Sequence, residues 1–230
     1  MVRGQDLTGA LIEQMWDLWK REFELLGDER DRFQHFVETC EGLTSVGLFR
    51  RPTGALIGFW SAETHHRHWR GVDFTQVYVP HYVLRSSMRG SVAPYATAIR
   101  GFAGDFARHP RSPIYVVAGS FPGSYIAIRS GPTRVATLAN ADPWEESLLL
   151  DVAATMGGEA WDPQMGLIRG HQIPRDADRP VQPHGKHAQF FDEYMRLNPT
   201  WRQGTVIPIL VRVQVNPRAW VRQVTGRHLR

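Results

Sequence analysis

The sequence is poor in the features that mark secreted and membrane proteins. It has one cysteine, Cys40, in 230 residues, which excludes an internal disulfide framework and favours a reducing compartment. No run approaches the ~18 consecutive apolar residues that a membrane-spanning helix needs. The N-terminal sequence contains no apolar stretch typical of a secretory signal. We therefore expect a cytoplasmic protein with no membrane partner.

The sequence also lacks the short motifs of several enzyme classes. It has no phosphate-binding P-loop, no dinucleotide fingerprint and no serine-hydrolase elbow, because Ser120 directly follows Gly119. The run His65–His68 has no cysteine or second histidine pair at ligand spacing that would complete a metal site. We interpret this run as a solvated turn between two strands and expect no metal.

Lysine is scarce as well. Lys20 and Lys186 are the only lysines among 27 basic residues, which leaves 25 arginines and a formal net charge of +4. Arginine binds phosphate through a planar, two-pronged group of donors. This composition permits a coenzyme or nucleic-acid partner without requiring one.

The middle of the chain predicts a strand, a polar loop, a helix and a second strand. Thr75–Leu84 is rich in β-branched and aromatic residues, which favour a mostly buried strand. Ala93–His109 has apolar residues at helical spacing, and Ile114–Ala118 is typical of a buried strand. These elements would place the loop Arg85–Ser91 at a strand-to-helix junction.

That loop has the chemistry of a phosphate site. Free N–H groups at the start of a helix, together with arginine side chains, attract phosphate or pyrophosphate. Glycine allows the backbone to approach such a ligand closely. The candidate contacts are Arg85, Ser87, Arg89, Gly90 and Ser91. The same residues are compatible with a solvated turn, and this alternative stays open.

Helices and strands are expected on both sides of this region. Helices are predicted over residues 6–26, 28–41, 186–197 and 217–226, with another starting at Asp142-Pro143, and strands over 45–50, 55–62 and 205–215. Residues 161–183 are rich in Pro, Gly, Asp and Arg and predict a long loop or lid. Cys40 lies at core spacing, so we expect a small buried hydrophobe rather than a reactive thiol.

The order of these elements resembles the acyl-coenzyme-A-binding core of the GNAT (Gcn5-related N-acyltransferase) fold over about residues 10–130. The family loop pattern is Arg/Gln-x-x-Gly-x-Gly/Ala, of which Arg85 and Gly90 are kept. The strand Gly54–Phe59 and the Pro143-Trp-Glu helix start are similar to those of divergent bacterial GNAT-like proteins. The resemblance implies an α/β (α+β) fold with a mixed, mostly antiparallel central sheet, a splayed strand pair and helices on both faces. It implies one domain over 1–230, with an acyl-donor core (1–130) and a C-terminal extension (131–230) that completes the sheet and the acceptor side.

The resemblance also implies an activity, the transfer of an acyl group from a thioester to an amine. The donor would be acyl-coenzyme A or an acyl carrier protein, held by backbone near Val83 and Ala118, and the acceptor a small-molecule amine. Tyr125 matches the family tyrosine that protonates the leaving thiolate. His81 is the first candidate for the base because it follows Pro80, and strand alternation would put it on the same face as Val79 and Val83. Glu63 is the second candidate base, and a structural role for His81 and Tyr125 stays open.

Two other functions are compatible with the sequence. An aminoacyl-tRNA ester could replace the thioester, because four arginines near the C-terminus, Arg218, Arg222, Arg227 and Arg230, could contact phosphates. A binding module could also keep the fold without the chemistry.

Overall fold

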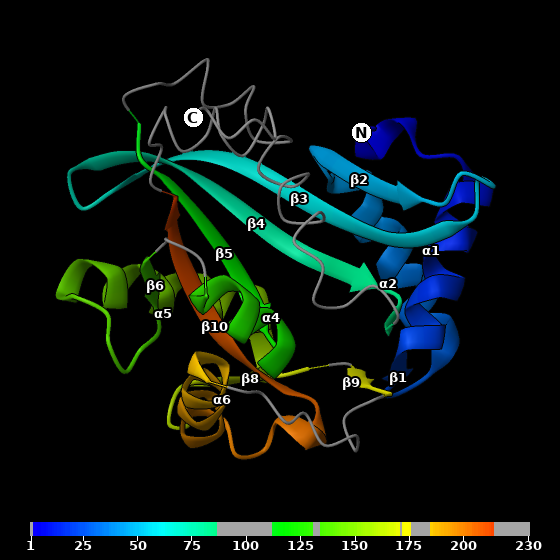
Figure 1. Ribbon diagram of the computed structural model, residues 1–230. Helices are drawn as coiled ribbons and strands as arrows, with labels where there is room; N and C mark the ends of the chain where they lie inside the picture. Colours follow the sequence, from blue (N-terminus) through cyan, green and yellow to red (C-terminus); the bar gives the residue numbers. More distant parts are fainter. Residues whose placement is uncertain (1, 87–111, 131–133, 171, 176–184, 214–230) are drawn as a thin grey trace, which may run out of the picture.

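The computed structural model describes residues 2–86, 112–130, 134–170, 172–175 and 185–213 (Figure 1). The helices are α1 (Gly9–Glu22), α2 (Glu29–Gly42), α4 (Pro122–Arg129), α5 (Pro143–Gly157) and α6 (Lys186–Leu197), with short 3₁₀ turns η1 (Gly4–Asp6), η3 (Gly158–Ala160) and η4 (Trp201–Gln203). The strands are β1 (Phe23–Leu25), β2 (Ser45–Arg50), β3 (Leu56–Trp69), β4 (Val72–Leu84), β5 (Ile114–Ser120), β6 (Arg134–Ala136), β7 (Trp161–Asp162), β8 (Leu167–Arg169), β9 (Gln172–Pro174) and β10 (Thr205–Val213). None of the described helices combines the length and apolar character needed to cross a bilayer.

One large sheet organises these elements. Its strand order is β2-β3-β4-β5-β10-β8-β7, with β6 also paired to β10. The β4–β5 pair is parallel, and the other neighbours are antiparallel. The predicted mixed, mostly antiparallel sheet is therefore confirmed.

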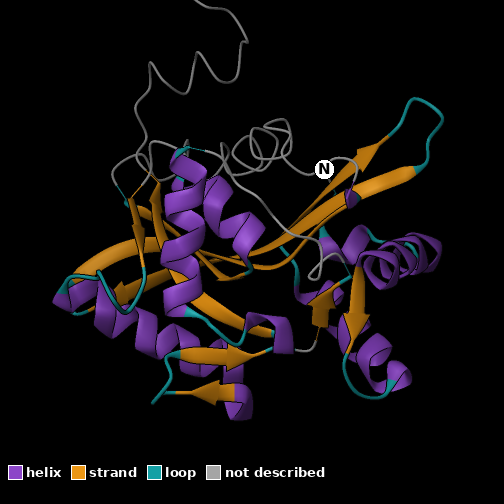
Figure 2. Ribbon diagram, turned by 60° about the horizontal axis from the view of Figure 1, so that its bottom comes forward, coloured by secondary structure: helices purple, strands orange, loops and turns teal. Residues whose placement is uncertain are grey.

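Helices cover both faces of the sheet (Figure 2). On one face α1 and α2 pack around Phe36 and Phe59, and α5 packs against Phe74 and Val117. Alternate residues of β10, such as Ile209, instead contact α4 and α6 on the other face. Because side chains alternate along a strand, this pattern divides the core into separate clusters above and below the sheet.

The start of α5 illustrates how the sequence determines a local boundary. The Asp142 carboxylate accepts hydrogen bonds from the backbone N–H groups of Trp144 and Glu145, and Glu145 accepts one in return from the Asp142 N–H. Pro143 occupies the first helical position, where no N–H is required. The predicted helix start is confirmed.

Several predicted boundaries were wrong. The run His65–His68 lies inside β3, and the turn comes later, at Arg70–Gly71, where both residues have positive φ. The first helix ends at Glu22, and Phe23–Leu25 forms a strand. Residues 161–175 contain the short strands β7, β8 and β9, so this part of the predicted loop is ordered by pairing. The predicted helices at 93–109 and 217–226 lie outside the described residues.

A β-bulge in β4 changes which side chains share a face. Ser61 pairs with His81 and Glu63 with Tyr78, so β4 uses one more residue than β3 over this interval. Val79 consequently packs with Val77, while Val83 packs with the α1–α2 cluster on the opposite face. The predicted single face for Val79, His81 and Val83 was therefore wrong, because the extra residue reverses the alternation.

Gly47 on β2 provides a test of the packing between β2 and β3. A Cβ at this position would lie 1.9 Å from the Trp60 indole nitrogen, and Trp60 is fully buried. We expect Gly47→Ala to lower the free energy of unfolding by about 1–3 kcal/mol, as overpacking does. Gly123→Ala is the matched control, because a Cβ at Gly123 would meet nothing within 4 Å. Urea denaturation of both variants measures the difference, and equal stabilities would contradict the described packing.

Candidate functional site

The parallel strands β4 and β5 separate part-way along their length. They pair over Thr75–Tyr78 and Ile114–Val117, and in the described part of the chain their pairing stops there. β5 stays hydrogen-bonded to β10 as far as Ser120, so it follows β10 away from β4. An opening results between residues 79–84 of β4 and residues 118–120 of β5. This is the splayed strand pair that the resemblance implies.

Backbone groups on both strands point into this opening. The Arg85 N–H donates to the Ile57 carbonyl oxygen on β3 at 3.0 Å. Because backbone groups alternate along a strand, those of Tyr82 and Leu84 point away from β3 and toward the opening. The Thr75 N–H donates to the Pro113 carbonyl oxygen, so by the same alternation Gly119 of β5 also points its groups toward β4. Extended ligands can pair with backbone groups directed in this way.

This alternation refines the two backbone positions predicted from the sequence. The amides of Val83 and Ala118 face β3 and β10, and the groups that face the opening belong to their neighbours. The prediction of donor contacts near these residues stays a prediction.

His81 is buried beside the opening. Its Nδ1 lies 3.0 Å from the Ser61 hydroxyl, and its ring centroid lies 4.8 Å from that of Trp19 and 5.1 Å from that of Phe36. Burial, with a smaller contribution from His35, lowers the pKa of His81 to about 3. The imidazole is therefore neutral at physiological pH and holds a proton only weakly.

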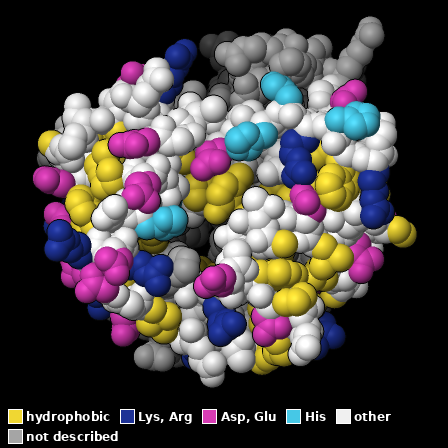
Figure 3. Space-filling view, turned by 180° about the vertical axis from the view of Figure 1, so that it is seen from behind, with side chains coloured by type: hydrophobic (Ala, Val, Ile, Leu, Met, Phe, Trp, Pro, Cys, Tyr) yellow, Lys and Arg dark blue, Asp and Glu magenta, His cyan; other side chains and the backbone are white. Residues whose placement is uncertain are grey.

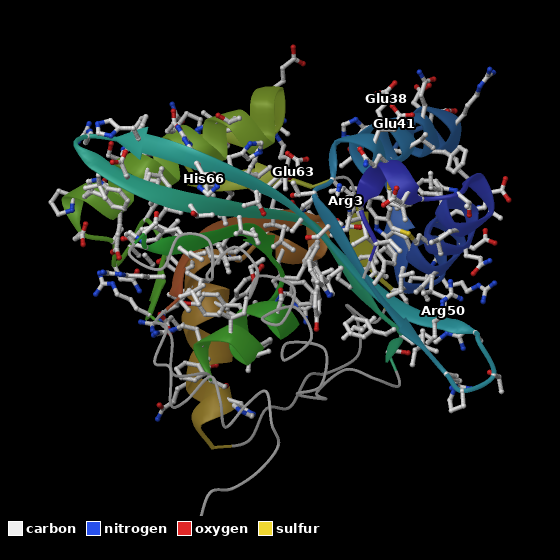
Figure 4. The ribbon with its side chains drawn as sticks, turned by 90° about the horizontal axis from the view of Figure 1, so that it is seen from above. Arg3, Glu38, Glu41, Arg50, Glu63 and His66 are labelled. Carbon is white, nitrogen blue, oxygen red and sulfur yellow. The ribbon has the colours of Figure 1, made fainter. Side chains whose placement is uncertain are left out.

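Glu63 occupies a more open position. It lies opposite Tyr78, the last β4 residue that pairs with β5, so the two side chains share the face between α1–α2 and α5. Burial and the Glu63 carboxylate raise the pKa of Tyr78 to about 12. The Glu63 side chain is 26% exposed, and one carboxylate oxygen lies 3.4 Å from His65 Nε2. Figure 4 shows Glu63 on β3.

This face of the sheet is polar in its middle and hollowed there. Next to Glu63 and Tyr78, Arg67 donates to the Gln76 side chain at 2.8 Å and to Asp151 of α5 at 2.9 Å. Figure 3 shows a hollow on this face, between the part built on α1 and α2 and the part built on α5. Glu63 and Tyr78 stand at the inner end of the opening.

Tyr125 lies in another part of the core. It is fully buried among residues that include Val135 and Ile209, with its ring centroid 5.4 Å from that of Tyr194. Burial is the main cause that raises the pKa of Tyr125. His81 contacts the α1–α2 cluster instead, so the structure does not bring these two predicted residues together. The catalytic role of Tyr125 stays a prediction.

The loop predicted to bind phosphate falls almost wholly outside the described residues, as do Ser87, Arg89, Gly90, Ser91 and the four C-terminal arginines. Arg85 is half-buried at the end of β4. The Ser86 N–H donates to the Glu22 carboxylate at 2.9 Å, which joins this strand end to α1. Within the described residues, no group of three or more His, Cys, Asp or Glu side chains could hold a metal ion.

Sequence reasoning missed Tyr78, Trp19 and Ser61. Tyr78 could be placed beside Glu63 only from the register of β3 against β4, which the bulge shifts. Trp19 lies on the predicted apolar stripe of α1, and its contact with His81 depends on tertiary packing. Ser61 carries no motif, and its partner is 20 residues away along the chain.

Neither the family models nor the curated proteins include a match. The sheet itself, with its parallel β4–β5 pair that separates after Tyr78, is the one that the sequence resemblance implies. The chain has a GNAT-like fold.

Solved structures that this chain is similar to include three with low identity and low TM-score. The first, a histone acetyltransferase HPA2 and related acetyltransferase from Corynebacterium glutamicum, has 16% identity and a TM-score of 0.36, over 60% of this chain and 87% of that chain. AtaT complexed with acetyl-methionyl-tRNAfMet has 10% identity and a TM-score of 0.34, over 52% and 81%. The NatC complex bound to Gag peptide and CoA has 11% identity and a TM-score of 0.33, over 88% and 92%.

Proposed function

We propose that the protein transfers an acyl group from a thioester to an amine. The observation that supports this best is the separation of β4 from β5, with backbone groups of Leu84 and Gly119 directed into it and the Glu63 carboxylate at its inner end. An extended thioester such as acyl-coenzyme A or an acyl carrier protein arm would pair with the backbone of Leu84 and Gly119. The acceptor amine would reach the acyl carbon from the hollowed face.

Glu63 is the better of the two predicted bases. An amine must lose a proton as its nitrogen bonds to the acyl carbon and the carbon–sulfur bond breaks. The Glu63 side chain is 26% exposed, so its carboxylate can take the proton from an amine that enters from solvent. His81, with a pKa of about 3 and a ring enclosed by aromatic side chains, is a weak base without comparable access. We assign His81 a positioning role, in which its ring packs between β4 and α1.

Tyr78 provides a second polar group at the inner end of the opening, beside Glu63. With a pKa of about 12 its hydroxyl stays protonated and can donate a hydrogen bond beside Glu63. The leaving thiolate would take its proton from solvent rather than from Tyr125, because Tyr125 packs beneath β10.

Arg85 provides the first test of the donor. It is the described arginine at the end of β4, where the phosphates of coenzyme A would lie if its pantetheine followed the strand. We expect Arg85→Ala to weaken acetyl-coenzyme A binding by about 1–3 kcal/mol, the scale of a lost charged hydrogen bond. Isothermal titration calorimetry measures this, and Arg50→Ala on β2 is the control. Equal affinities for the two variants would argue against this position of the donor.

The same titrations separate the alternatives. Binding of a carrier-protein-linked thioester without binding of acetyl-coenzyme A would identify the carrier protein as donor. Binding of aminoacyl-tRNA alone, steeply weakened by salt, would favour the tRNA ester. A protein that transfers no acyl group from any of these donors would be a binding module with a GNAT-like fold.

A further inference from the structure

The end of β5 is paired along only one of its two edges. In the described part of the chain its pairing with β4 stops at Val117, whereas its pairing with β10 continues to Ser120. Gly119, whose backbone groups are directed into the opening, lies in this one-sided stretch. A strand end with few contacts can open locally while the rest of the sheet stays paired. The width of the opening at Gly119 therefore depends on what else holds the end of β5.

Tyr194 of α6 supplies such a contact. Its hydroxyl group donates a hydrogen bond of 2.8 Å to the carbonyl oxygen of Ser120, the residue directly after Gly119. Tyr194 is fully buried, in the cluster where α6 packs against α4. Burial raises the pKa of Tyr194, so the hydroxyl keeps the proton that it donates. The bond thus holds the end of β5 from the face of the sheet opposite α5.

Asn198, which directly follows α6, holds the Tyr194 hydroxyl in turn. Its Nδ2 donates to the Tyr194 hydroxyl oxygen at 3.1 Å and to the Thr205 carbonyl oxygen at 2.9 Å. Its Oδ1 accepts from the Thr205 hydroxyl at 2.7 Å and from the Thr200 hydroxyl at 3.3 Å. Both polar atoms of this fully buried amide have two partners each, so the amide has one favoured orientation.

These hydrogen bonds form one directed network. Asn198 Nδ2 can only donate, so the Tyr194 hydroxyl accepts from it and uses its single hydrogen for Ser120. A buried network in which every member is satisfied holds its atoms in one geometry. Thr205 is the first residue of β10, so the network joins α6, β10 and β5 at the same end of the opening. We call these residues the Tyr194 network: Ser120, Tyr194, Asn198, Thr200 and Thr205.

We propose that Tyr194 and Asn198 are positioning residues for the thioester, and that they set the width of the opening through Ser120. The identity of the ligand in this inference rests on the proposed function. The backbone of Leu84 and of Gly119 can hold one extended molecule between them only if the two strand ends keep a fixed separation. Loss of the Tyr194 bond would let the end of β5 move. The defect would appear in donor binding rather than in the chemical step, which takes place at the inner end.

Hydrogen exchange tests this positioning without any ligand. Tyr194→Phe removes the hydroxyl and keeps the ring, and exchange of the Ala118 and Ser120 amides, which face β10, is followed by NMR. We expect this exchange to become at least about tenfold faster in the variant, because the strand end opens more often. The matched control is Tyr115→Phe, which removes the hydroxyl of a buried tyrosine on β5 itself, on the α5 face of the sheet. Equal exchange rates in the two variants would overturn the inference.

Donor binding is the second measurement. We expect Tyr194→Phe to raise the Kd for acetyl-coenzyme A about tenfold in isothermal titration calorimetry, while kcat at saturating donor changes less than about twofold. Tyr115→Phe should leave this Kd unchanged. A merely structural role of Tyr194 would lower the melting temperature without altering the Kd of folded molecules, so both variants are titrated well below their melting temperatures. A carrier-protein thioester replaces acetyl-coenzyme A if the unmodified chain binds only the former.

Two variants of Thr205 extend the test to the rest of the Tyr194 network. Thr205→Val keeps the shape of the side chain but removes the hydroxyl that donates to Asn198, whereas Thr205→Ser keeps that hydroxyl. We expect weaker donor binding in Thr205→Val and normal binding in Thr205→Ser. If Tyr194→Phe does not fold, this pair decides, and equal Kd values for the two Thr205 variants overturn the inference.

The outcomes separate the inference from the proposed function. Faster exchange at Ser120 together with weaker donor binding in Tyr194→Phe supports the inference. Equal donor Kd values in Tyr194→Phe and the unmodified chain overturn it, while the proposed function stands. If the unmodified chain binds no thioester, the proposed function fails, and the exchange rates alone decide whether Tyr194 holds the end of β5.

Discussion

Replacing Glu63 by glutamine should lower kcat for acyl transfer by a factor of roughly 10²–10⁴, the contribution typical of a general base. Glutamine keeps the size of the side chain and a hydrogen-bonding oxygen but cannot accept the amine proton. Binding of the thioester should change little, because Glu63 lies at the inner end of the opening and away from the backbone groups of Leu84 and Gly119. Steady-state kinetics with a saturating thioester measures the loss.

Glu38→Gln is the matched control for this experiment. Figure 4 shows Glu38 on α2 and Glu63 on β3. Glu38 is exposed, and its carboxylate accepts a hydrogen bond from Gln34 one helical turn away at 3.1 Å. The control loses the same charge, so a general electrostatic effect would slow both variants. A Glu63→Gln variant with unchanged kcat and an unchanged pH profile would remove Glu63 from the mechanism.

Acid should destabilise the protein through His81. Burial lowers the pKa of His81 in the folded protein to about 3, against 6.5 for an exposed histidine. Between these values the unfolded chain binds the extra proton, so the free energy of unfolding falls as the pH falls. From pH 6.5 to pH 4 the loss is on the order of 3 kcal/mol, at 1.36 kcal/mol for each pH unit. Above pH 6.5 this contribution is fully present.

Urea unfolding at pH 7 and pH 4 measures this effect in the unmodified chain and in His81→Gln. Glutamine can still hydrogen-bond to Ser61 but does not titrate, so the variant should lose less stability on acidification. The glutamine also changes packing against Trp19, and the resulting decrease in the free energy of unfolding should be similar at both pH values. His187→Gln, at an exposed histidine of α6, is the control. Identical acid sensitivity in His81→Gln and the unmodified chain would contradict a buried, neutral His81.

The fold was more predictable from sequence than the site. Caps and periodicity are local, so α5 could be placed from Asp142 and Pro143 alone. The strand pair at the centre followed from two apolar runs separated by a polar segment and a predicted helix. The resemblance then supplied a topology that composition and spacing could not provide.

Relations across the sheet were less predictable. The bulge opposite Ala62 adds one residue to β4, and a sequence read by alternation alone places every side chain beyond it on the wrong face. The residue type of His81 therefore marked it as a candidate base, but the sequence did not show that Trp19 and Phe36 enclose its ring. The pairing of β1 with β9 was unpredictable for another reason, because the two strands are only three residues long each and carry no strand pattern.

The pairing of β1 with β9 also has a consequence for how the chain acquires its structure. Trp19 and Gln172 are 153 positions apart in sequence, so their contact closes one of the longest loops in the molecule. Contacts of such high sequence separation carry a large entropic cost and tend to form slowly. During synthesis α1, β2, β3 and β4 emerge well before β9 is made. Trp19 of α1 can therefore bond to Gln172 only late in synthesis. The native arrangement around the opening is thus completed only after most of the chain has been made.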